Sequence, residues 1–358
     1  MIGRRGFVAF LCGQAGCLLR RRPALALAAG YLWSRQSGGG GWHSHTYGLL
    51  RSGQSLTPFV LEALLRIPPA AYPLPAAQVD RALAFIRRNT RADGALGLSD
   101  PDFEDYPNYA TALAVSALCR AGRQPEVQPM VAYLRGQQFT GQNGWRPQDP
   151  AYGAWGMGGE RRTPPGTGHV DLSMTRHVME ALRAAGVPAS DAALQCARVY
   201  VERCQNRDTD GGFFFTTTEF DTNKAGHDGK RYRSYGTTTA DGILALRAAG
   251  LPPEHPRVAA AHRWLADHHC GMAVPGFIGE AYERWPAGLA YYYSSVAGQA
   301  FQFLGLDAGS LFGNLQSAQR ADGSWSNPEN LVKEDDPLIA TPFALRALLA
   351  HGFSPVDS

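Results

Sequence analysis

The stretch Gln319-Arg320-Ala321-Asp322-Gly323-Ser324-Trp325 decides the fold, because related versions of it recur along the chain. It runs from a glutamine through a glycine to an aromatic residue, and it lies between two amphipathic helical runs. The other copies are Gln36 to Trp42, Gln138 to Trp145, Gln205 to Phe213 with its Asp210-Gly211-Gly212, and the weaker Arg91 to Gly94 and His269 to Phe277. A recurring turn between paired helices is typical of a repeat protein, so the sequence predicts six helical hairpins.

Apolar residues at helical spacing predict the two runs of each hairpin. The first runs lie near residues 25–36, 76–89, 125–138, 189–206, 255–269 and 309–320. The second runs lie near residues 47–67, 106–121, 170–185, 234–249, 287–304 and 337–351. We therefore expect an all-α protein.

The second runs can be aligned by their C-terminal ends, where a glycine is typical of a left-handed cap. The residues at these ends are Pro68, Gly122, Gly186, Gly250, Gly305 and Gly352. Eleven residues earlier stand Thr57, Thr111, Thr175, Thr239, Ser294 and Thr341, and five residues earlier stand Ala63, Ala117, Ala181, Ala245, Ala300 and Ala347. Because these small residues share one helical face, they predict close packing against partner helices.

Six such pairs can close into a ring that leaves no hydrophobic end exposed. The predicted fold is therefore an (α/α)6 toroid, a closed double ring of six helical hairpins, formed as a single domain by residues 24–358. In each turn, the glutamine amide can bond free backbone groups at the helix ends, and the glycine permits the sharp bend.

The composition narrows the classes of partner. A net charge of +3 in 358 residues, with no basic stripe, argues against nucleic acid. No apolar run reaches the ~18 residues that a transmembrane helix needs, although peripheral contact with a membrane stays open. The six cysteines include no CxxC pair, so neither a disulfide framework nor a zinc knuckle is indicated. The sequence leaves the oligomeric state open.

Residues 1–23 are predicted to form a flexible leader. Arg4-Arg5-Gly6-Phe7-Val8 before an apolar stretch resembles a twin-arginine export signal. Arg20-Arg21-Arg22 interrupts that stretch and no cleavage site follows, so a disordered extension or a start codon assigned too early is the alternative. The sequence therefore does not decide whether the protein is cytoplasmic or exported.

The glutamine-to-tryptophan turns resemble the QW repeat of squalene-hopene and other triterpene cyclases. Gln319 to Trp325 is the direct match, and the resemblance covers residues 25–352 as a repeat. The hairpin arrangement also resembles the β subunits of protein prenyltransferases. This resemblance implies a helical toroid of the terpene cyclase and prenyltransferase superfamily, with a central cavity that accepts an isoprenoid chain.

The catalytic motifs of these families do not carry over. Class II cyclases place Asp-x-Asp-Asp before an inner helix that begins Thr-Ala-Phe, but Ala340-Thr341-Pro342-Phe343 follows Pro337-Leu338-Ile339, and no Asp-x-Asp-Asp occurs in the chain. Where prenyltransferases have the Asp and Cys of their zinc site, the aligned residues are Arg233 and Tyr235. No metal and no cofactor are therefore predicted.

Three residues are candidates for catalysis. His177 and Asp241 occupy equivalent positions on neighbouring inner helices, where a buried carboxylate beside an imidazole can form an acid–base couple. The alternative is a hydrogen bond that only joins the two helices. Asp335 precedes Pro337 at a helix start, where it can be an active-site acid at the mouth of the ring or an N-cap.

Eight further residues are candidates for substrate binding on the face that lines the hole. They are Tyr109, Tyr291, Tyr292, Tyr235, His169, Asp171, Glu62 and Glu180. Aromatic walls stabilise carbocations without quenching them, and at most two of Tyr291, Tyr292 and Tyr293 can face the cavity. Asp171 can instead be an N-cap. Glu62, Glu180 and two arginines make the lumen more polar than ordinary cyclase chemistry prefers.

The segment 213–233 is longer than the other connections, and it can be a lid, a binding loop or a solvated insertion. The leading hypothesis is a terpenoid-cyclase-like or prenyltransferase-like protein that binds a polyisoprenoid or similar lipid in its cavity. One alternative is a glycosidase or lyase that uses Glu62, Glu180 or Asp241 on a polar substrate. The other is a non-catalytic binding or scaffold protein.

Overall fold

The computed structural model describes residues 23–97, 106–306 and 309–350. Within these ranges the regular secondary structure is helical, and the β-bridges, such as Gln205 with Phe213, are isolated. The expected leader of residues 1–23 lies outside the described residues, apart from residue 23, which is already helical.

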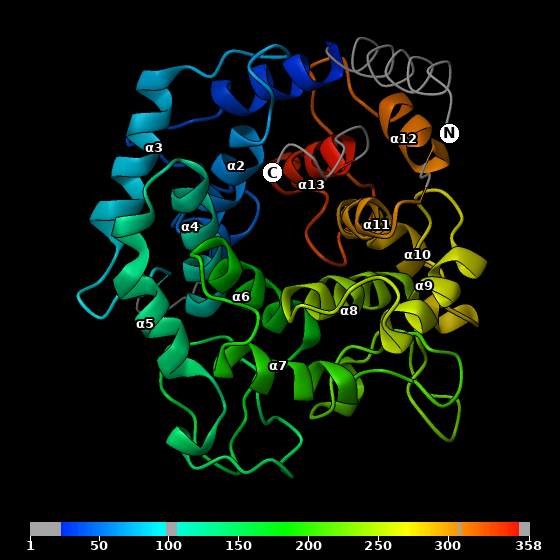
Figure 1. Ribbon diagram of the computed structural model, residues 1–358. Helices are drawn as coiled ribbons and strands as arrows, with labels where there is room; N and C mark the ends of the chain where they lie inside the picture. Colours follow the sequence, from blue (N-terminus) through cyan, green and yellow to red (C-terminus); the bar gives the residue numbers. More distant parts are fainter. Residues whose placement is uncertain (1–22, 98–105, 307–308, 351–358) are drawn as a thin grey trace, which may run out of the picture.

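Six helices form an inner ring: α2 (Leu56–Leu65), α4 (Pro107–Arg120), α6 (Leu172–Ala184), α8 (Gly236–Ala248), α11 (Ala290–Leu304) and α13 (Pro337–Ala350). Each contacts the next, and α13 returns to α2, so the ring closes (Figure 1). The outer ring consists of the helical segment 23–34, α3 (Ala76–Asn89), α5 (Gln128–Gln137), α7 (Ala192–Arg203), α9 (Pro256–His268) and α12 (Gly309–Ser317). This arrangement confirms the predicted α/α toroid.

Short helices occupy the connections between the two rings. They are η1 (Gly48–Leu50), η2 (Gln124–Val127), η3 (Gly141–Asn143), η4 (Phe220–Thr222), η5 (Glu280–Tyr282) and α10 (Trp285–Gly288). The longest of the helices with printed bounds, α11, has 15 residues, and none in the described chain is long and apolar enough to cross a bilayer.

The small face of the inner helices is fully buried, as its composition predicted. The aligned threonines also bind the turns. The Thr57 hydroxyl accepts a hydrogen bond from the Trp42 backbone N–H at 3.1 Å, and Thr341 accepts one from Trp325 at 3.1 Å. Thr111, Thr175 and Thr239 do the same for Leu96, Trp155 and Phe213. The repeat therefore fixes each of these turns to the helix that follows it.

The turn glutamines join neighbouring outer helices. The amide of Gln319 donates to the carbonyls of Gly323 and Ala24, so it links the last hairpin to the first. Gly323 has a φ of +90°, and a Cβ there would lie 2.4 Å from the Leu27 carbonyl oxygen. Only glycine permits this bend and this close approach.

Two predictions of local structure were wrong. In the third turn the aromatic residue that matches Trp42 and Trp325 is Trp155, whose indole N–H donates to the Leu134 carbonyl at 2.7 Å, whereas that of Trp145 donates to Arg162. The helix expected over residues 47–67 begins at Leu56, because Gly53 adopts a left-handed conformation with a φ of +76° and interrupts it.

Candidate functional site

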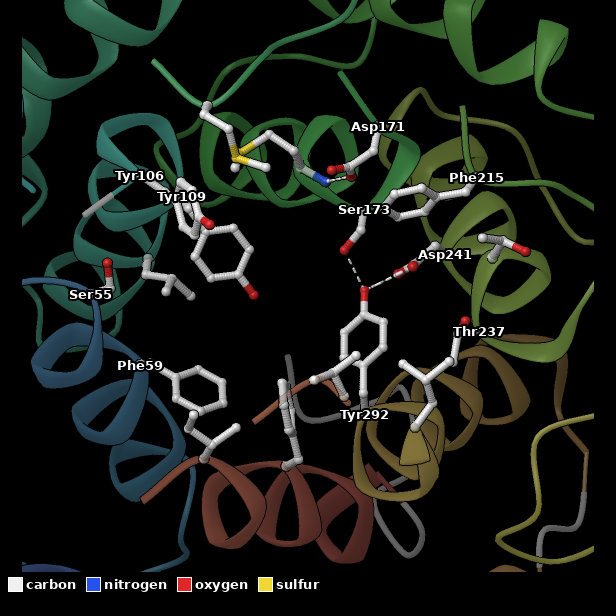
Figure 2. A pocket seen from close by; sticks show the side chains of 18 of the residues that line it. Ser55, Phe59, Tyr106, Tyr109, Asp171, Ser173, Phe215, Thr237, Asp241 and Tyr292 are labelled. Carbon is white, nitrogen blue, oxygen red and sulfur yellow. Dashed lines mark hydrogen bonds between the residues drawn. The ribbon is translucent and has the colours of Figure 1, made fainter. Parts of the chain in front are cut away.

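A cavity of about 330 Å³ lies on the ring axis, at the end where the inner helices begin. We call it the apolar cavity. Every inner helix contributes to its wall, which is largely apolar. Its aromatic residues are Phe59, Tyr106, Tyr109, Phe215, Tyr235, Tyr292 and Phe343. Figure 2 labels Phe59, Tyr106, Tyr109, Phe215 and Tyr292 among them. Two carboxylates interrupt this wall, Asp171 at the start of α6 and Asp241 on α8.

A second cavity of about 730 Å³ lies where the inner helices end, and we call it the arginine cavity. Glu62, Glu180 and His177 line this cavity, not the apolar one. The sequence interpretation placed the glutamates and the tyrosines on the walls of one lumen. The structure separates them, because the polar residues lie on later turns of the inner helices than the aromatic ones.

Asp241 is buried in a network of three partners. Its Oδ1 lies 2.7 Å from Nε of Arg176, and the Tyr292 hydroxyl donates to the carboxylate at 2.8 Å. The Ser173 hydroxyl lies 2.5 Å from the Tyr292 oxygen, so it donates to Tyr292 when Tyr292 donates to Asp241 (Figure 2). Burial raises the pKa of Asp241 to about 6, although Arg176 and Tyr292 act in the opposite direction. Asp241 is therefore mostly ionised at neutral pH.

His177 does not form a direct pair with Asp241, because Arg176 lies between them. Nη2 of Arg176 lies 3.0 Å from Nε2 of His177, and Nδ1–H of His177 donates to the Ser173 carbonyl at 2.8 Å. Burial and the charge of Arg176 hold the His177 pKa well below its usual range. His177 is thus a neutral imidazole that accepts a hydrogen bond from Tyr109 at 3.1 Å.

Asp171 combines the two roles that the sequence left open. As the N-cap of α6, it accepts a hydrogen bond from the Met174 N–H at 2.7 Å, and its other oxygen lies 2.9 Å from Nε2 of His169. Nδ1 of His169 lies 2.6 Å from Glu219. Burial lowers the His169 pKa, but Asp171 and Glu219 outweigh it, and the net shift is upward. His169 therefore lies between two carboxylates that favour its protonated form, and it adjoins the apolar cavity.

The long loop 213–233 builds a vestibule of about 800 Å³ that shares His169, Phe215 and Lys224 with the apolar cavity. Lys224 places its ammonium 3.4 Å from the centroid of the Phe215 ring. Burial lowers the Lys224 pKa to about 8, although the charges of Asp171 and Asp241 act to raise it. The loop therefore forms part of the cavity wall.

The remaining candidates have different positions. Tyr235 and Tyr292 line the apolar cavity, whereas Tyr291 is buried beside Glu334, because successive side chains of a helix point in different directions. Asp335 lines neither named cavity nor the vestibule, and its carboxylate accepts a hydrogen bond from the Tyr47 hydroxyl. Asp336 is the acid that bonds the start of α13, through the Leu338 N–H at 2.9 Å.

No protein-family model and no curated protein sequence matches the chain. Among solved structures, the fold is similar to a variant of the type II terpene cyclase MstE from Scytonema in complex with its substrate geranylgeranyl dihydroxybenzoate, over 96% of this chain and 99% of that one, with a TM-score of 0.62 at 15% identity. The toroid resembles that of a type II terpene cyclase. This confirms the resemblance found in the sequence.

The same toroid is found in other proteins. A protein from Actinoplanes matches over 92% of this chain and 98% of its own, with a TM-score of 0.58 at 16% identity. D-mannose isomerase matches over 83% and 86%, with a TM-score of 0.55 at 11% identity. At such identities the similarity concerns the fold alone, so the function must be argued from the site.

Proposed function

We propose that this protein is a terpenoid cyclase of the type II kind, which protonates a polyprenyl chain in the apolar cavity and closes it into rings. The observation that carries the proposal is the combination of an aromatic wall with Asp171, a carboxyl group connected through His169 to the vestibule. Such a wall tolerates a carbocation, and such an acid can start one.

Asp171 is the proposed proton donor, and it first receives a proton from His169, whose Nε2 lies 2.9 Å from its carboxylate. Its proton goes to a carbon of the terminal alkene, which leaves a cation on the neighbouring carbon and a carboxylate on Asp171. That carboxylate is stabilised by the hydrogen bond from the Met174 N–H at the start of α6. His169 then returns a proton to Asp171 from the side of Glu219 and the vestibule.

The wall of the cavity guides the positive charge. Each ring closes when the next alkene attacks the cation, and Phe59, Phe343 and Tyr292 stabilise the charge through their ring faces. Asp241, ionised at neutral pH, takes the final proton. The product is therefore an isomer of the substrate, and no oxidant or reductant is needed.

The volumes favour a long chain with a polar head. The apolar cavity of about 330 Å³ receives the end of the chain that reacts, and it adjoins the larger vestibule of about 800 Å³. The rest of the chain and its head then lie toward the vestibule, where Lys224 supplies a positive charge. We propose an acidic aromatic head, as in the substrate of MstE.

The geometry gives the two other hypotheses less support. Glu62 faces Arg66, Arg120 and Arg346, whose charges outweigh its burial and lower its pKa to about 2. It therefore stays ionised and cannot be the acid of a glycosidase. A scaffold protein would not need an open cavity with an acid in its wall.

The experiment is incubation of the purified protein with geranylgeranyl dihydroxybenzoate, followed by mass spectrometry and NMR. We expect a product of unchanged mass that has lost olefinic signals. Asp171→Asn should reduce the rate by about 10²–10⁴-fold, and Asp335→Asn, outside the cavities, should leave it unchanged. The proposal would be overturned if the unchanged protein left both this substrate and a farnesyl analogue as linear chains.

A further inference from the structure

The arginine cavity has no part in the proposed cyclisation. Arg176 and His177 separate it from the aromatic wall, and all six inner helices contribute residues to it. Its arginines are Arg66, Arg120, Arg176, Arg183, Arg247 and Arg346, and Ser116, Gln299 and Gln302 add neutral polar groups. Six guanidinium groups thus converge on one space of about 730 Å³.

Positive charge exceeds negative charge around this space. Within the described residues, the acids that pair with these arginines are Glu62, Glu180 and Asp241, so six arginines face three acids. Arg183 and Arg247 have no acidic partner in the described chain. Arg183 donates to the Val187 carbonyl at 2.6 Å, and Arg247 lies 5.6 Å from the centroid of the Phe303 ring.

The floor of the cavity contains a buried cation with an unfilled donor. Arg346 is 8% exposed, its guanidinium carbon lies 4.6 Å from the centroid of the Phe59 ring, and its Nε has no hydrogen-bond partner among the described residues. Its pKa is lowered by burial and by the charges of Arg66 and Arg176, which together outweigh Glu62. A buried cation of this kind is stabilised by any anion that supplies the missing acceptor.

We propose that the arginine cavity is a second binding site, for a small phosphorylated anion that carries two or more phosphoryl groups. Guanidinium groups bind phosphate oxygens in a bidentate manner, and several of them around a concave space select a compact polyanion over a single charge. The volume lies in the range of small-molecule sites. The buried position of Arg346 favours a ligand that enters the ring over a flat membrane surface, whose phosphates would stay at the rim.

The test uses inorganic pyrophosphate as the probe and isothermal titration calorimetry on the full chain. We expect saturable binding with one site per chain. Arg183 and Arg247 are exposed, so the double variant Arg183→Gln, Arg247→Gln should fold normally and bind at least about tenfold more weakly. Glu180→Gln removes a competing carboxylate and should bind more tightly. Lys230→Gln, on an exposed loop beside the vestibule, should bind as the unchanged protein does.

Sedimentation with vesicles distinguishes a lipid headgroup from a soluble anion. We expect no more binding to phosphatidylglycerol vesicles than to phosphatidylcholine vesicles, and no competition by either for pyrophosphate. Absence of saturable pyrophosphate binding would overturn the proposal. It would also be overturned if Lys230→Gln lost as much pyrophosphate affinity as the double arginine variant, or if Glu180→Gln gained none. Binding to vesicles alone that depends on the arginines would overturn it as well. None of these outcomes depends on whether the protein cyclises a polyprenyl chain.

Discussion

Nε of Arg176 lies 2.7 Å from Oδ1 of Asp241, and this buried ion pair separates the two cavities of the ring. Arg176 also pairs with Glu180 on the side of the arginine cavity, so one guanidinium compensates a carboxylate on each side. The pair explains how one lumen contains both an aromatic chamber and a strongly polar one. It also links the charge state of Asp241 to the residues of the second cavity.

Replacing Arg176 with Gln should reduce the free energy of unfolding by about 3–5 kcal/mol at neutral pH, because it leaves Asp241 buried without its cation. Burial already raises the Asp241 pKa above that of an unfolded chain, to about 6, and Arg176 limits this rise. The folded state of the variant will therefore bind a proton more readily. The difference in the free energy of unfolding between the variant and the unchanged protein should therefore decrease as the pH falls to about 5, where Asp241 becomes neutral.

Urea denaturation of Arg176→Gln and of the unchanged protein at both pH values measures this difference. Arg176→Lys, which keeps the charge, is the matched control and should recover part of the stability. A loss that is the same at both pH values would show that Asp241 is not the group left uncompensated.

Replacing Tyr292 with Phe should shift the pH dependence of the cyclisation rate. The Tyr292 hydroxyl donates to Asp241 and lowers its pKa, so its removal should move the acidic limb of the profile from about pH 6 upward, by up to roughly one unit. Tyr293→Phe is the control, because the Tyr293 hydroxyl bonds His269 on another face of α11. An unchanged acidic limb in Tyr292→Phe would remove Asp241 from the proposed role of base.

Replacing Lys224 with Met should weaken the binding of a substrate with an acidic head. We expect the KM for geranylgeranyl dihydroxybenzoate to rise by about 10- to 100-fold, the value of one charge-assisted hydrogen bond, with little change in kcat. The methyl ester of the same compound should be insensitive to the substitution. Lys230→Met, an exposed lysine of the same loop, should change neither constant, and an equal effect on acid and ester would contradict the assignment.

The sequence was sufficient for the fold because the repeat carries its own evidence. The aligned threonines and alanines occupy one face, and the structure buries that face in every inner helix. The third turn was misassigned, since two tryptophans, Trp145 and Trp155, follow Gln138, and the contacts of Trp155 with Thr175 and Leu134 distinguish them only in the structure. Turn length is not fixed by the hydrogen bonds that define this repeat.

The site was predictable only in part. The helix register predicted that Tyr109, Tyr292, Tyr235 and Asp241 line the cavity together with His169 and Asp171. All six residues line the apolar cavity. It could not show that Arg176 divides the lumen, because the reach of a guanidinium depends on its side-chain conformation. It also could not assign Phe215, Glu219 or Lys224, which lie in a loop without periodicity.

The most direct test of the account is cyclisation of geranylgeranyl dihydroxybenzoate in deuterium oxide, with the product examined by mass spectrometry and NMR. Because the proposed route supplies the proton of Asp171 from solvent through His169, we expect one non-exchangeable deuterium on the carbon that receives the initiating proton. Asp171→Asn should give almost no product. A cyclised product without that deuterium, or an equal yield from Asp171→Asn, would contradict the proposed role of Asp171.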